Sequence, residues 1–60
     1  MLAVEIQDHA RKLLAAHGAR ALAEAAQKAK ALEDAGKKDE AQDWRRIEAA
    51  LRQLSGPRAT

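Results

Sequence analysis

The amino-acid sequence predicts an all-α fold: an antiparallel helical hairpin or a small three-helix bundle, completed by homodimerisation. Alanine, leucine, glutamate, lysine, arginine and glutamine dominate the 60 residues, and these are the strongest helix formers. The β-branched residues form no alternating run of the kind that favours a strand. The glycines and the single proline stand where helices are expected to end. We therefore expect one helical domain over residues 1–55 and a disordered tail over residues 56–60.

The last helix is predicted over residues 39–54. Gly36 is suited to closing the preceding helix in a left-handed conformation. Asp39 can cap the next helix, with Gln42 three residues further on as in a capping box. The apolar side chains of this helix recur at helical spacing and share one face: Trp44, Ile47, Leu51 and Leu54.

The N-terminal part of the chain allows two interpretations. One apolar stripe ends at His17, a second begins at Leu22, and the two are out of phase with Gly18 between them. A break at Gly18 gives helices over about 2–16 and 19–35. Without the break the whole stretch is one helix that tolerates Gly18 at about 1 kcal/mol. The phase change favours the break, although no nearby side chain can cap the second helix.

The small apolar content of the chain predicts association with a partner. A single core of this size rarely supplies more than about 3–5 kcal/mol, and without cysteine no disulfide can add to it. We expect a homodimer of helical hairpins that presents a mixed-charge surface to a protein partner. Trp44 is expected at the centre of the contact, because tryptophan is enriched at interface hot spots. The full predicted interface comprises Trp44, Ile47, Leu51 and Leu54, faced by Leu32, Ala29 and Ala25.

Nucleic-acid binding is the alternative function, through an arginine face near the C-terminus. The residues concerned are Arg45, Arg46, Arg52 and Arg58. Nucleic-acid binders usually carry a denser basic stripe, and a lone tryptophan provides no stacking platform for bases. This composition therefore argues against a nucleic-acid partner.

Metal binding through histidines across a dimer is a second alternative. His9 and His17 lie eight residues apart, about 12 Å along a helix, so one helix cannot bring both to one ion. His17 falls on the apolar stripe and is expected to pack or to cap a helix, whereas His9 is expected to be exposed. We predict no metal site and no cofactor.

The residues that carry most enzyme chemistry are scarce. The single serine and single threonine both lie at the C-terminal end, and there is neither cysteine nor tyrosine. Four acidic residues have a cation at i,i+4 spacing, which is typical of a solvated helix face: Glu5 with His9, Asp8 with Lys12, Glu24 with Lys28 and Glu48 with Arg52. We expect a protein that is not an enzyme.

The chain is expected to be cytoplasmic and to have no membrane partner. No run approaches the roughly 18 apolar residues of a membrane span. The first residues lack the basic and apolar regions of a signal peptide, and the absence of cysteine fits a reducing compartment.

Two resemblances accompany these predictions. The chain carries His17-Gly18, Ala35-Gly36, Trp44-Arg45-Arg46-Ile47 and a helix ending in Leu51 and Leu54. In these features it resembles short uncharacterised helical proteins of alphaproteobacteria, which implies a similar fold and no particular activity. Residues 35–41 followed by 49–51 also resemble the second half of a tetratricopeptide repeat, although Trp44 stands one place from the usual aromatic position. Membership of that family would imply peptide binding, but we interpret the likeness as a similar hairpin.

Overall fold

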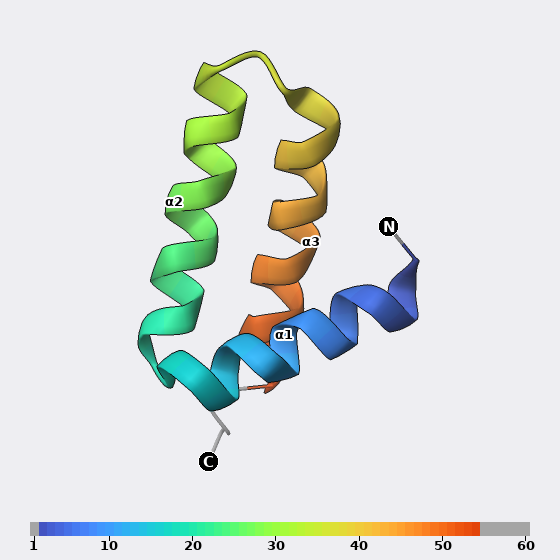
Figure 1. The fold of residues 1–60 in the computed structure, drawn as a ribbon, viewed down its shortest axis with the longest axis vertical. Helices are drawn as coiled ribbons and strands as arrows, with labels where there is room; N and C mark the ends of the chain where they lie inside the picture. The colour runs from blue at the N-terminus through green and yellow to red at the C-terminus, as the bar shows by residue number, and fades with distance from the viewer. Residues whose placement is uncertain (1, 55–60) are drawn as a thin grey trace.

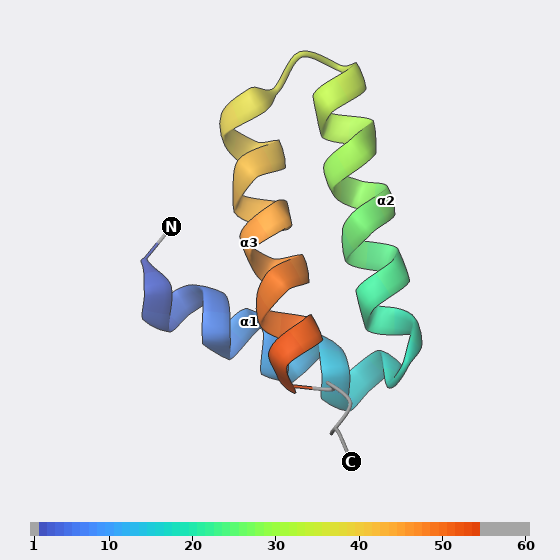
Figure 2. The ribbon, with the colours of Figure 1, turned by 180° about the vertical axis from the view of Figure 1, so that it is seen from behind.

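The computed structural model describes residues 2–54, which form a three-helix bundle. The helices are α1 (Ala3–His17), α2 (Arg20–Asp34) and α3 (Lys38–Leu54). Helices α2 and α3 run antiparallel as a hairpin, and α1 crosses the lower part of α3 (Figure 1). The reverse view confirms that α1 lies against one face of the hairpin (Figure 2). The described residues contain no strand, so the all-α prediction is confirmed, while the predicted tail lies outside them.

The connection between α1 and α2 depends on Gly18, and the predicted break is present. Gly18 has φ 62° and ψ −137°, a backbone conformation that glycine reaches easily and residues with a Cβ avoid. Its N–H donates to the carbonyl of Leu14 at 2.8 Å, and its carbonyl accepts from Ala21 at 3.1 Å. Helix α2 then begins after Ala19 without a side-chain cap. Gly18 alone therefore supplies the sequence signal for this turn.

The turn between α2 and α3 is a Schellman motif closed by Gly36. Gly36 has φ 79° and donates its N–H to the carbonyl of Glu33 at 3.0 Å. Lys37 donates to the carbonyl of Leu32 at 2.8 Å, which completes the pair of bonds that defines this cap. The predicted role of Gly36 is confirmed.

Helix α3 begins one residue earlier than predicted, and the expected cap is wrong. The carbonyl of Lys37 accepts the first helical hydrogen bond, from Ala41 at 2.9 Å, so Lys37 occupies the N-cap position. Asp39 lies inside the first turn, together with Glu40. Both carboxylates still stabilise the helix, because they lie at the positive end of its dipole.

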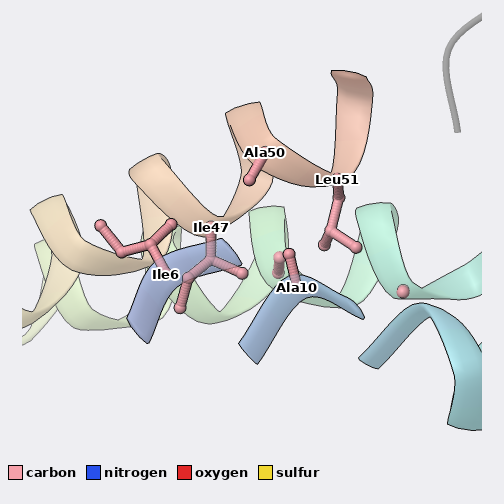
Figure 3. Packing of buried hydrophobic residues seen from close by; sticks show 7 residues of the cluster. Ile6, Ala10, Ile47, Ala50 and Leu51 are labelled. Carbon is pink, nitrogen blue, oxygen red and sulfur yellow. The ribbon is translucent and has the colours of Figure 1, made fainter. Parts of the chain in front are cut away.

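The core is built mainly from alanine. Among residues 2–54, nine apolar residues are buried, and six of them are alanines: Ile6, Ala10, Ala21, Ala25, Ala29, Ala41, Ile47, Ala50 and Leu51. The small side chains allow α2 and α3 to approach closely, and these two helices share the most extensive contact. Figure 3 shows Ile6 and Ala10 of α1 directed toward Ile47, Ala50 and Leu51 of α3. The fold therefore rests on three large buried side chains, those of Ile6, Ile47 and Leu51.

Replacing Leu51 with alanine should remove much of the stability of the fold. Leu51 has no exposed surface, and a buried Leu→Ala change typically costs about 2–5 kcal/mol. Chemical unfolding followed by circular dichroism measures the loss. Arg11→Ala is the control, because Arg11 lies on the exposed side of α1 and its replacement should cost well under about 1 kcal/mol. Equal losses in the two variants would contradict the assignment of the core.

Candidate functional site

Trp44 lies at the junction of the three helices. The His9 ring of α1 meets the Trp44 ring edge-on, with 5.3 Å between ring centroids and 68° between planes. The ammonium of Lys28 on α2 lies 5.8 Å from the Trp44 ring, within the range of a cation–π contact. Trp44 is half-buried and packs against the core. It therefore links α1 and α2 to α3 inside a single chain, with part of its surface still accessible.

The expectation of an exposed His9 is wrong. His9 is half-buried against Trp44, because the side of α1 that bears it faces the hairpin. His17 shows the reverse error, since its side chain is 45% exposed and neither packs in the core nor caps a helix. Its Nδ1 lies 3.3 Å from the carboxylate of Glu24, so it forms an ion pair between α1 and α2 when protonated. The two histidines thus contact the hairpin at different points.

A linear network of charges joins α2 to α3. Arg45 donates two hydrogen bonds to Glu33, from Nε at 3.2 Å and from Nη2 at 3.1 Å. Arg45 Nη1 also donates to Glu48 at 3.0 Å, and Arg52 Nη2 donates to the second oxygen of Glu48 at 3.1 Å. We call these four residues, Glu33, Arg45, Glu48 and Arg52, the charge network. Its two acids and two bases balance, so each charge is neutralised locally.

Glu48 is the acidic centre of this network and is largely buried. Its side chain is 12% exposed, so leaving the carboxylate unpaired would carry a desolvation penalty. Both of its oxygens accept a bond from an arginine. At the α2 end, the hydrogen bonds from Arg45 hold the pKa of Glu33 below its ordinary value. The same bonds raise the pKa of Arg45, which stays charged at every physiological pH.

Most of the predicted interface residues are buried inside the fold of a single chain. Ile47, Leu51, Ala25 and Ala29 have no exposed surface, so in this fold they form the seam between α2 and α3 and the core beneath α1. Leu32 and Trp44 are half-buried. Leu54, at the end of α3, is 39% exposed. A contact with a second copy of this fold can therefore use only the last three of these residues without rearrangement.

Within residues 2–54, the arginines of the nucleic-acid alternative are not gathered into one patch. Arg45 and Arg52 belong to the charge network, and Arg58 lies outside the described residues. Arg46 lies apart from them in the shallow groove between α1 and α3 described below. Two arginines of this predicted face, Arg45 and Arg52, are therefore already paired with carboxylates of the same chain.

The groove between α1 and α3 was not foreseen from the sequence. Small and amide side chains line it together with one isoleucine and one cation: Ala3, Ile6, Gln7, Arg46, Ala49, Ala50 and Gln53. The first turn of α1 exposes two large apolar side chains, Leu2 at 67% and Val4 at 70%. The apolar periodicity of the sequence does not reveal the groove or the exposed residues beside it, because the periodicity of α1 does not show where α1 meets α3.

The titratable side chains of residues 2–54 are spread over the three helices. These residues hold no group of three or more histidine or acidic side chains placed to bind one metal ion. Asp8 pairs with Lys12 at 3.6 Å and Glu48 with Arg52, as their spacing predicts. Glu24 pairs with His17 and with Arg20, at 3.7 Å, while Lys28 lies over Trp44. Of these contacts, the His17–Glu24 pair and the approach of Lys28 to Trp44 join different helices.

Across the described part of the chain, each helix is too short or too polar to cross a bilayer. Comparison with family models, with curated proteins and with solved structures gave no match. The resemblances stated above therefore stay predictions.

The Glu33–Arg45 pair should make the fold sensitive to acid. Because the folded-state pKa of Glu33 lies below its ordinary 4.5, the pair stabilises the fold above that value. This contribution is lost as the pH falls through the lowered value. We expect Glu33→Gln to destabilise the protein near neutral pH and to have a smaller effect in acid, measured as urea midpoints between pH ~7 and pH ~3.

Asp34→Asn is the control, since it removes the same charge from a residue that forms no ion pair with residues 2–54. If Glu33→Gln cost as much stability in acid as at neutral pH, the pair would not carry this dependence.

Proposed function

We propose that this is a non-enzymatic, cytoplasmic protein that acts by association, first with a second copy of itself and then with a protein partner. The observation that carries the proposal is the small core. Among the described residues, Ile47 and Leu51 are the largest fully buried side chains, and most of the other buried apolar residues are alanines. A core of this kind leaves little stability to a single chain. Burial of further apolar surface between two copies adds to this stability.

The exposed apolar side chains support the same proposal. Leu2, Val4 and Leu54 are the large hydrophobic residues that remain exposed within residues 2–54. Leu54 ends α3 at the end of the molecule where α1 turns into α2 (Figures 1 and 2). Trp44 contributes a half-buried aromatic ring. These residues offer apolar area to a second copy without disturbing the core.

The charge network supports protein association over nucleic-acid binding. Two of the proposed phosphate contacts, Arg45 and Arg52, would first have to leave Glu33 and Glu48. Neutralised pairs of this kind contribute little to the counterion release that drives nucleic-acid binding. A mixed-charge surface instead suits a protein partner, where charges set orientation and specificity.

Sedimentation equilibrium with circular dichroism on the same samples tests the proposal. We expect a dimer whose melting temperature rises by about 5–10 °C for each tenfold increase in protein concentration, because dissociation accompanies unfolding. A monomeric mass at every concentration, with a melting temperature independent of concentration, would overturn it.

Leu54→Lys should weaken the dimer about tenfold or more by placing a charge in the contact. Ala31→Lys is its control, because Ala31 lies on the exposed side of α2 and lysine is a good helix former. A dimer equally tight in both variants would exclude Leu54 from the contact.

A further inference from the structure

We propose that two copies associate by exchanging α1, so that α1 of each copy packs on the α2–α3 hairpin of the other. This inference rests on the association proposed above and specifies its mode. The hinge is the Gly18–Ala19 connection. In the exchanged form residues 3–34 straighten into one helix, about 48 Å long.

The local sequence around the hinge favours a continuous helix. Ala15, Ala16, Ala19 and Ala21 flank the glycine, and alanine has the highest helix propensity of all residues. Ala19 provides no side-chain cap for α2, and no proline interrupts the segment. The turn therefore depends on Gly18 together with the tertiary contacts of α1, and neither a side-chain cap nor a proline fixes it.

The tie between α1 and its own α2 is slight. Of the three helix pairs, α1 and α2 share the smallest contact. An exposed ion pair joins them, between His17 and Glu24 at 3.3 Å. In a straight helix these two residues lie seven positions apart, about 10 Å along the axis, so the pair belongs to the closed form. In the exchanged form this pair is lost, whereas α1 regains its packing contacts on the hairpin of the other copy.

The contacts of α1 with α3 can form equally well between two copies. Ile6 and Ala10 pack on Ile47, Ala50 and Leu51, and an identical hairpin of a second copy presents the same surface (Figure 3). Exchange therefore keeps the buried core of each hairpin and forms two equivalent contacts related by a two-fold axis. It also brings together the two hinges, beside the end of α3 that carries Leu54 (Figure 1).

The backbone conformation of Gly18 provides a specific test of the exchange. At Gly18 the closed form uses a positive φ that a Cβ disfavours, whereas a continuous helix uses a negative φ. Replacing Gly18 with alanine penalises the closed turn and favours the straight helix, which is the direction that exchange requires. A Cβ at Gly18 meets no atom within 4 Å, so the effect is one of backbone conformation and not of collision.

Gly18→Ala should lower the dissociation constant of the dimer about tenfold or more and leave helicity at or above the wild-type value. Gly36→Ala is the matched control. Gly36 also has a positive φ with open space around it, but it closes the hairpin with the largest contact. We expect Gly36→Ala to lower the melting temperature without tightening the dimer. A Gly18→Ala variant that is less stable and no more associated would overturn the exchange.

An engineered cysteine pair detects the exchange directly. Because the natural chain contains no cysteine, any disulfide must form between the introduced residues. Ala3 and Ala49 line the same groove between α1 and α3. In an exchanged dimer, oxidation of the Ala3→Cys/Ala49→Cys chain yields covalent dimers on a denaturing gel. In a closed chain, the same disulfide closes within one chain and the band stays monomeric.

The outcomes separate the two proposals. Covalent dimers from the double variant, together with cross-linked pairs from a mixture of the two single variants, support exchange. A sedimenting dimer whose cysteines close within one chain overturns exchange but leaves association standing. A chain that is monomeric by sedimentation, as wild type and as Gly18→Ala, overturns both.

Discussion

The close approach of α2 and α3 over alanine is the constraint on which the rest of the molecule depends. With Ala21, Ala25 and Ala29 on α2 fully buried, there is little room between these helices for larger side chains. The large side chains Ile47 and Leu51 therefore occupy the cluster that α1 covers. The hairpin is compact and well closed by its Schellman turn, but its core has few large groups. This design makes the position of α1 decisive, because α1 completes the core from outside the hairpin.

Polar contacts complement this thin core. The charge network ties the α2 and α3 helices together through Arg45, and the network satisfies Glu48, a carboxylate that would be costly to bury alone. On α1, His9 meets Trp44 and His17 meets Glu24. The hairpin thus has the more strongly bonded pair of helices, whereas α1 is held by the buried side chains of Ile6 and Ala10 and by two histidines. A difference of this kind is what allows one helix to move while the others stay together.

The proposed function follows from this balance. A chain whose core is barely sufficient gains most from a partner, and a chain with a glycine hinge can obtain that partner by sharing α1. Two ion pairs among the described residues join different helices: His17 with Glu24 between α1 and α2, and Glu33 with Arg45 between α2 and α3. Association is the function that we propose from these contacts.

Much of the fold could be predicted from the sequence, because helix propensity and punctuation are local properties. The helical content, the breaks at Gly18 and Gly36 and the burial of Ala25, Ile47 and Leu51 follow from residue types and spacing. The sequence also showed that the core would be small.

The tertiary structure alone decided which faces of different helices meet. Periodicity defines a face on each helix but not the rotation and crossing of one helix on another. For this reason His9 was placed in solvent although it packs on Trp44, and Arg45 was assigned to a basic face although Glu33 and Glu48 bind it. The pairing of Glu33 with Arg45 joins residues twelve positions apart in the chain, a contact that no helical spacing reveals.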